Sequence, residues 1–190
     1  MNKEFIKKTG IWFLAIALFA AHVFFRNAAH ADEATNASKW PSMKAKNGEC
    51  HIAFPTAPQM IEQSLPLADG MGRLNYDIYI APFEDKGVFM LLVATYPMPV
   101  SGGHEVAGLE GLIRGIVGHH PDNKLIFANL IETGGYPAIN FLVQSGTSYF
   151  RGEALMVGNK LFLIAMEGRK ADMSEKLFTK FLKSFKLLHY

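Results

Sequence analysis

The chain has 190 residues, with 19 Lys and Arg against 17 Asp and Glu, a formal net charge of +2 and 49% hydrophobic residues. This composition is too apolar and too weakly charged for a disordered chain, and a single cysteine excludes an internal disulfide framework. The 17 Gly and 9 Pro are too few for a collagen-like or low-complexity sequence, and the length is typical of one domain.

The N-terminal segment has the layout of a secretory signal. Three lysines within residues 1–8 precede an apolar run over residues 10–25, and small residues follow. Ala29 and Ala31 fit positions −3 and −1 of a cleavage site, which predicts a signal peptide over residues 1–31. The competing interpretation is an uncleaved membrane anchor, although the apolar run is shorter than the ~20 residues of a spanning helix.

Removal of this segment changes the charge of the protein. The segment holds four basic residues and one acid, so the remaining 159 residues carry 15 basic and 16 acidic side chains, a net charge of −1. No basic field remains that would attract nucleic acid. We therefore expect a periplasmic or secreted protein that binds no nucleic acid. It would touch the membrane only through the N-terminal segment, if that segment is retained.

Residues 32–48 are polar and aperiodic and predict a flexible lead-in, in which Trp40 is a candidate for docking on the folded part. Residues 49–190 are predicted to form a single α+β domain. Apolar residues alternate or run continuously in its strands, as in the doubly apolar stretch 88–96, which predicts a central strand. The predicted strands are 50–54, 60–65, 74–80, 88–96, 124–133, 138–145, 149–157 and 160–167.

Two segments of this domain have helical periodicity. Leu109, Leu112, Ile113 and Ile116 lie on one face of a helix predicted over 104–118, and a last helix begins at 172 or 174. Because the strands follow one another in hairpins, the sequence predicts a mainly antiparallel sheet of about seven to eight strands. Two long helices are predicted to cover it.

Histidines give weak support for a metal site. His104 and His119 lie at opposite ends of the predicted helix, ~22 Å apart, which is too far for a shared ion. His119, His120 and Asp122 offer a loop site, but the favoured interpretation is helix termination. No metal and no cofactor are predicted.

Catalytic patterns are equally weak. No serine lies in a Gly-x-Ser-x-Gly motif. Cys50 and His51 are adjacent in a strand, so their side chains point to opposite faces, and Cys50 is predicted to be an inert buried thiol. Arg151 and Glu153 are predicted to form a surface pair. The sequence therefore predicts no catalytic residue and a protein that is not an enzyme.

Four glycines form a stripe on the first helix: Gly108, Gly111, Gly115 and Gly118. Each costs ~1 kcal/mol of helix propensity relative to alanine. A partner backbone or a ligand approaching this stripe would offset the cost, so the four glycines are the interaction candidates. The alternative is a surface helix that is held only by the packing of its apolar face, and it is the favoured one.

Several short motifs resemble those of a known group. They are Ala-Phe-Pro at 53–55, Gly-Tyr-Pro-Ala at 135–138, Val-Gly-Asn-Lys-Leu-Phe at 157–162 and Lys-Ser-Phe at 183–185. Their order resembles small exported bacterial proteins of unknown function with a PsbP-like fold, which is shared by a Ran-binding nuclear transport factor. The resemblance implies an adaptor or interaction protein and transfers no catalytic residue.

Two function classes follow. The first is an exported, non-catalytic protein-interaction module of the bacterial cell envelope, whose partner is another envelope protein or a second copy. The alternative is a small-molecule or lipid binding protein with an apolar pocket between sheet and helix. The 9 Met and 15 Phe suit adaptable apolar pockets, although an ordinary core explains them equally well.

Overall fold

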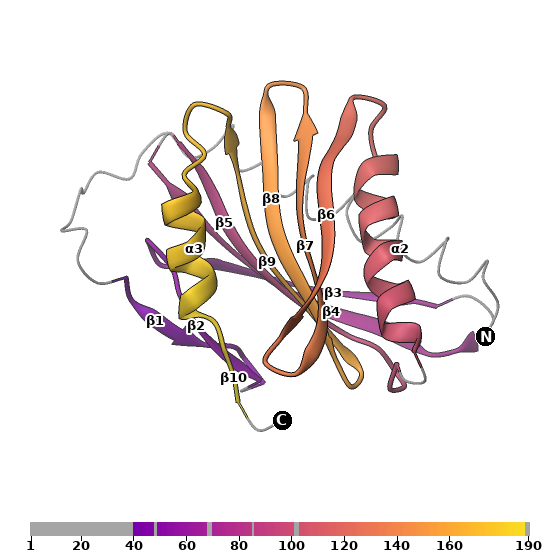
Figure 1. Cartoon of the computed structure of the whole chain (residues 1–190). Coiled ribbons are helices and arrows are strands. Elements are labelled where there is room, and N and C mark those ends of the chain that lie inside the picture. Colours follow the sequence, from indigo (N-terminus) through magenta and orange to yellow (C-terminus); the bar gives the residue numbers. More distant parts are fainter. Residues whose placement is uncertain (1–39, 48, 68–69, 85, 101–102, 189–190) are drawn as a thin grey trace.

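The structure is a computed structural model that describes residues 40–47, 49–67, 70–84, 86–100 and 103–188 (Figure 1). The predicted signal peptide, with its cleavage residues Ala29 and Ala31, lies outside the described residues. Within the described ranges, no helix is at once long enough and apolar enough to cross a membrane.

Seven antiparallel strands form the main sheet, in the order β3-β4-β5-β9-β8-β7-β6. Strand β5 is buried along almost its whole length between β4 and β9, which confirms the predicted central strand. The alternating sequence predicts all seven strands, with ends that differ by a few residues. Their bounds are β3 (Gln59–Pro66), β4 (Arg73–Phe83), β5 (Gly87–Thr95), β6 (Asn123–Thr133), β7 (Tyr136–Ser145), β8 (Ser148–Val157) and β9 (Lys160–Arg169).

Two helices pack on this sheet, and both are short. Helix α2 (His104–Gly118) has the predicted bounds and 15 residues, and α3 (Glu175–Ser184) has 10. Ser174 caps α3, because its hydroxyl accepts a hydrogen bond from the backbone N–H of Leu177 at 3.3 Å. The prediction of two long helices is therefore wrong: the fold is mostly sheet.

A second, three-stranded sheet joins both ends of the described chain. Strands β1 (Ser42–Lys44) and β10 (Lys186–Leu187) flank β2 (Cys50–Ala53), both in antiparallel pairing. The ring of Trp40 packs edge-on against Phe89 with centroids 5.2 Å apart. Residues 42–44 of the predicted flexible lead-in thus form a strand, and the docking of Trp40 is confirmed.

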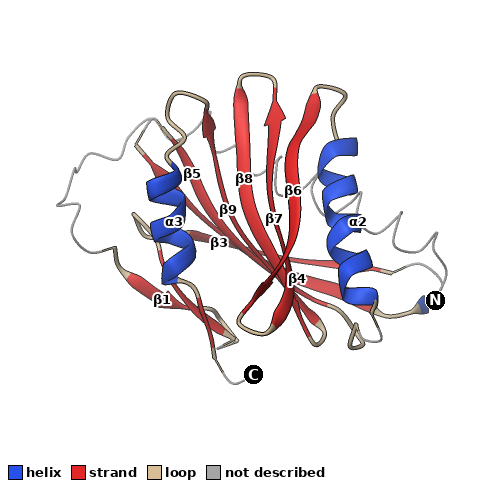
Figure 2. Cartoon of the chain, viewed as in Figure 1, coloured by secondary structure: helices blue, strands red, loops and turns tan. Residues whose placement is uncertain are grey.

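The main sheet separates two hydrophobic cores. Because side chains alternate along a strand, successive residues of β5 and β9 enter opposite cores. Helix α2 covers one face, and α3 with the small sheet covers the other (Figure 2). We call these the α2 face and the α3 face.

Candidate interaction surface

Strand β6 forms one edge of the main sheet, and the end of α2 fixes where it begins. The side-chain Nδ2 of Asn123 donates a hydrogen bond of 2.7 Å to the backbone oxygen of Ile116, in the last turn of α2. The same oxygen accepts the backbone N–H of His119 at 3.4 Å, so the Asn123 side chain adds a second hydrogen bond at the end of the helix. The chain then runs as β6 for 11 residues beside β7, its one neighbour among the described strands.

Large hydrophobic side chains are exposed along this edge. We define the edge surface as Leu125, Ile126, Leu130 and Ile131, which are 44%, 50%, 51% and 39% exposed. Among the described residues, only Met60 and Met98 are other large hydrophobics with comparable exposure. Solvent-exposed apolar groups of this size, gathered on one strand, are typical of an interaction site.

The edge surface extends over both faces of the sheet. Leu125 and Leu130 lie opposite Val143 and Ile139, whose side chains belong to the core of the α2 face. Ile131 lies opposite Ala138, which belongs to the core of the α3 face. A partner strand beside β6 would therefore cover apolar side chains on both of its sides.

The other edge of the sheet, strand β3, has more polar residues. It carries Gln59, Gln63 and Ser64, ends at Pro66 and exposes one large hydrophobic side chain, Met60, at 37%. Its Glu62 pairs with Lys46 at 2.6 Å. Charged residues and proline are devices that protect an edge strand from pairing with another chain. The two edges therefore differ, and β6 is the one that lacks these devices along most of its length.

A β-bulge and two charges modify β6 near its ends. The register with β7 shifts between Leu125 and Phe127, which leaves Ile126 as the extra residue. Lys124 and Glu132 are exposed close to the two ends of the strand. The regular part of β6 consequently runs from residue 127 to 133, between a basic and an acidic end.

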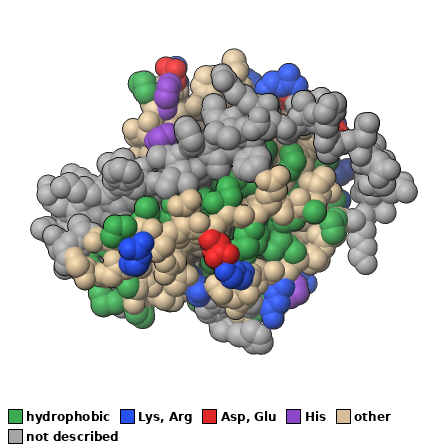
Figure 3. Space-filling view, turned by 180° about the vertical axis from the view of Figure 1, so that it is seen from behind, with side chains coloured by type: hydrophobic (Ala, Val, Ile, Leu, Met, Phe, Trp, Pro, Cys, Tyr) green, Lys and Arg blue, Asp and Glu red, His purple; other side chains and the backbone are tan. Residues whose placement is uncertain are grey.

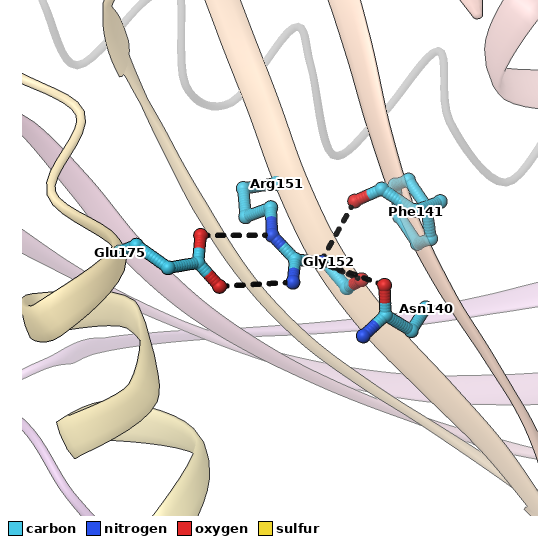
Figure 4. A network of polar contacts seen from close by, with 5 residues as sticks. All are labelled: Asn140, Phe141, Arg151, Gly152 and Glu175. Carbon is cyan, nitrogen blue, oxygen red and sulfur yellow. Dashed lines mark hydrogen bonds and ion pairs between the residues drawn. The ribbon is translucent and has the colours of Figure 1, made fainter. Parts of the chain in front are cut away.

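A buried arginine, Arg151 on β8, contacts both α3 and β6, and its hydrogen bonds are drawn in Figure 4. The guanidinium of Arg151 lies 4.4 Å from the ring centroid of Phe178 on α3 and 5.2 Å from that of Phe127 on β6. Its Nη2 and Nε donate to the two carboxylate oxygens of Glu175, at 3.1 and 3.3 Å.

The remaining contacts of Arg151 are with the sheet. Its Nη1 donates to Asn140 Oδ1 at 3.2 Å and to the backbone oxygens of Phe141 and Gly152 at 3.1 and 3.2 Å. Glu153 is also buried, and its Oε1 accepts from the hydroxyl of Thr133 at 2.8 Å. The predicted surface pair of Arg151 and Glu153 is therefore wrong, because both side chains are buried and each has a different partner.

The predicted burial of the Cys50 thiol is confirmed, and its low reactivity stays a prediction. Cys50 is fully buried, and burial, with a smaller effect of the Glu49 carboxylate, raises its pKa to about 12. Glu49 itself is buried, and its Oε1 accepts a hydrogen bond from Lys160 Nζ at 2.9 Å. This ion pair links the small sheet to β9, so Glu49 and Lys160 have a structural role.

Two of the histidines follow the end of α2. His119 and His120 are exposed, and His120 Nδ1 accepts a hydrogen bond of 3.2 Å from the backbone N–H of Asp122. No three His, Cys, Asp or Glu side chains of the described residues come together in an arrangement that could hold a metal ion.

The glycine stripe of α2 does not share one environment. Gly111 and Gly115 are buried, whereas an added Cβ at Gly108 or Gly118 would meet no atom within 4 Å. The interaction predicted for this stripe stays a prediction.

The sequence analysis does not predict the edge surface, since its residues have the pattern of an ordinary core.

Charges are dispersed on the side of the molecule that is hidden in Figure 1. In that view, the part of the surface that is not grey shows hydrophobic side chains among backbone and other side chains, and Lys, Arg, Asp and Glu side chains are scattered singly or in small groups (Figure 3). The described residues in this view therefore form no continuous basic area of the kind that binds nucleic acid.

Comparison with known proteins supports the fold. No family model and no curated protein matches the chain. The solution structure of cyanobacterial PsbP (CyanoP) from Synechocystis sp. PCC 6803 is similar, with a TM-score of 0.53 and 12% identity over 84% of this chain and 99% of that chain. A crystal structure from Bacteroides thetaiotaomicron VPI-5482 covers 78% of this chain and 48% of its own at 11% identity, but its TM-score of 0.43 is too low to support a conclusion. The first similarity supports the PsbP-like fold that the motifs predict.

Proposed function

We propose that the protein is an exported, non-catalytic interaction module of the bacterial cell envelope, which binds its partner along the edge surface of β6. The observation that carries this proposal is the concentration of exposed Leu and Ile side chains on one open edge, while the opposite edge exposes one large hydrophobic side chain, Met60.

The edge offers two sources of binding free energy. An extended segment placed beside β6 would pair with the outward backbone N–H and C=O groups, as in β-strand addition. It would also cover four side chains that are each about half exposed, and half of the ~1.5–3 kcal/mol of full burial gives about 1 kcal/mol for each. Together these contributions suit a specific but modest affinity.

Export is supported by the layout of residues 1–31. The intact mass of the protein, isolated from a host that expresses the full chain, tests it. We expect a product that begins at Asp32. A product that retains residues 1–31 would favour the membrane anchor instead.

A cross-linking experiment in cells tests the interaction. A photoreactive residue replaces Leu130 on the edge surface, and the matched control replaces Met98, which is similarly exposed at 56% against 51% but lies outside β6. We expect a discrete protein adduct from position 130 and none from position 98. Absence of an adduct at 130, or the same adduct from both positions, would contradict the proposal.

The alternative function, a small-molecule or lipid binder, keeps its support from the sequence alone. Leu109, Ile113 and Ile116 of α2 are buried against the sheet, where the pocket was expected. Native mass spectrometry of the protein from its host separates the two functions, because a stoichiometric small molecule would favour the alternative.

A further inference from the structure

We propose that the protein binds the surface of an anionic lipid bilayer through a set of lysines on helix α3 and the small sheet. The inference goes beyond the proposed function, because it concerns a second surface and a partner of a different class. We call this surface the lysine face. Its five members are exposed and are Lys44, Lys176, Lys180, Lys183 and Lys186.

Charge is distributed unevenly along the chain. Residues 169–190 carry six basic and two acidic side chains, a net charge of +4. Residues 32–168 carry nine basic and fourteen acidic side chains, a net charge of −5, and the two parts sum to −1. The expectation that the protein touches a membrane only through its N-terminal segment rests on this small sum, which conceals a local excess of positive charge.

Helix α3 presents a stripe of lysines. Lys176, Lys180 and Lys183 are four and three residues apart, so at ~100° per residue they lie within ~60° of arc. Phe178 and Phe181 lie on the opposite side of the helix and are buried in the core of the α3 face. The stripe therefore points away from the sheet.

The small sheet carries a row of basic side chains. Lys44 of β1 lies opposite His51 of β2, which lies opposite Lys186 of β10, so the three side chains share one face. Cys50 and Ile52 point to the other face of β2 and are fully buried. The row therefore also points away from the main sheet.

The stripe and the row belong to one continuous surface. Strand β10 begins two residues after the end of α3, and the chain runs directly from one into the other (Figure 1). The hydroxyl of Ser184, the last residue of α3, accepts a hydrogen bond of 3.0 Å from the backbone N–H of Ala53 on β2. This contact holds the helix beside the small sheet.

Carboxylates of the protein leave most of the lysine face unneutralised. Lys46 and Lys160 each pair with a glutamate, and Glu175 on α3 is bonded to Arg151. Four members of the lysine face form no ion pair with a carboxylate of the described residues: Lys44, Lys176, Lys183 and Lys186. Their charges are therefore available to an external anionic partner.

The residue type favours lipid over an acidic protein. Every member is a lysine, and the nearby Arg169 is not a member because it pairs with Asp172. Lysine is a compact, strongly hydrated charge, and it is depleted in protein interfaces, in which arginine is enriched. Anionic headgroups attract such clusters, and each lysine near the surface strengthens binding by about fivefold.

The N-terminal segment joins the protein at the same face. Lys180 Nζ lies 4.4 Å from the ring centroid of Trp40, the first described residue. The apolar run of the predicted signal or anchor ends at residue 25, which is 15 residues before Trp40. A chain that retained this run would be tethered to the bilayer at the lysine face, and a chain that lost it would bind reversibly.

Co-sedimentation with vesicles tests the inference on the protein isolated from a host that expresses the full chain. One set of vesicles contains phosphatidylcholine and phosphatidylglycerol, and the other contains phosphatidylcholine alone. A retained N-terminal segment contributes to both, so the ratio of the two binding constants measures the lysine face. We expect a ratio well above one at low salt, which falls toward one in ~1 M salt, where the Debye length is ~3 Å.

Matched variants assign the effect to the lysine face. Lys176→Gln combined with Lys183→Gln should lower the ratio by about 10- to 30-fold, and adding Lys44→Gln and Lys186→Gln should remove the preference for anionic vesicles. Arg114→Glu is the control, because it also changes the net charge by two units but lies on α2, across the sheet, at an exposed site. It should leave the ratio nearly unchanged. Circular dichroism verifies that each variant is folded.

Three results would overturn the inference. They are equal binding to the two kinds of vesicle, a ratio that the first pair of glutamine substitutions leaves intact, and an equal loss from Arg114→Glu. A chain that ignores anionic vesicles but is cross-linked in cells from position 183 to an acidic protein would replace lipid by that protein. None of these results affects the cross-link from position 130, so the proposed function is tested separately.

Discussion

Replacing Arg151 by alanine should destabilise the fold more than any other single charged substitution proposed for this protein. The side chain is 9% exposed and lies between the rings of Phe127 and Phe178. It joins α3 to two strands through five hydrogen bonds. The variant Arg151→Ala removes all of these contacts at once.

The contacts of Arg151 are not equal in free energy. Its carboxylate partner Glu175 is 67% exposed, so water replaces the guanidinium there and the ion pair contributes less than ~1 kcal/mol. The acceptors on Asn140, Phe141 and Gly152 are on the covered side, and losing their donor costs about 2 kcal/mol in all. Loss of the contacts with the two aromatic rings adds about 1 kcal/mol. The expected total is about 3 kcal/mol.

Urea unfolding, followed by tryptophan fluorescence, measures the effect. We expect Arg151→Ala to lower the midpoint by roughly 1–2 M and Glu175→Gln to lower it by less than ~0.5 M. Arg169→Ala is the control, because Arg169 is 67% exposed and pairs only locally with Asp172. Equal losses for Arg151→Ala and Glu175→Gln would show that the ion pair dominates and would refute the reasoning.

Three further predictions concern other residues. Gly108→Ala should raise the free energy of unfolding by ~0.5–1 kcal/mol, because the added Cβ meets open space on a helix. Gly152→Ala should lower the free energy of unfolding by ~1–3 kcal/mol, because the added Cβ would lie 2.5 Å from the ring of Phe141. Thermal unfolding of the two variants measures both effects. At pH 8, Cys50 should react with a thiol reagent about a thousandfold more slowly in the folded than in the unfolded chain, since burial raises its pKa from 9.0 to about 12. Because of the same shift in pKa, the contribution of Cys50 to stability is full below pH 9 and is lost as the pH rises toward 12. If Cys50 of the folded chain reacted rapidly with the thiol reagent, the raised pKa and both of its consequences would be contradicted. Burial, followed by the nearby Glu62 carboxylate, raises the pKa of Asp77, so the folded state binds its proton more readily than the unfolded state. Asp77→Asn should therefore stabilise the fold at pH 7, and the gain should vanish as the pH falls below the ordinary aspartate range; a gain that is independent of pH would contradict this cause.

The sequence predicts the elements whose signal is local. Leu109, Leu112, Ile113 and Ile116 recur with helical spacing, and the bounds of α2 follow from Gly103 before it and Pro121 after it. The small sheet could not be predicted in this way. Strands β1 and β10 have three and two residues, and they exist because β2 lies between them. Their stability comes from contacts between distant parts of the chain, so no window of the sequence contains it.

The buried arginine shows the same limit for single side chains. Arg151 and Glu153 are two residues apart in a strand. Because side chains alternate along a strand, the sequence predicts that the two lie on the same face of the sheet and form a surface pair. They do share a face, but α3 covers it, and the Glu175 carboxylate competes for the guanidinium. Whether a charged pair is exposed depends on which helix packs above it. Here that helix is α3, whose residue Glu175 is more than 20 residues from Arg151 in the sequence.

The edge surface presents the sharpest case. Strand β5 is a continuous apolar run, and β6 holds two shorter apolar runs, 125–128 and 130–131, with Asn129 between them. Consecutive apolar residues of this kind are typical of a strand that is covered on both faces. The predicted central strand β5 does lie between β4 and β9, whereas β6 lies last in the order and has β7 as its one neighbour among the described strands. Strand order is a property of the whole topology, so the sequence of β6 cannot reveal that its Leu and Ile side chains are exposed. In the proposed complex a partner strand covers this edge, and the apolar residues of β6 then belong to a strand inside a larger sheet.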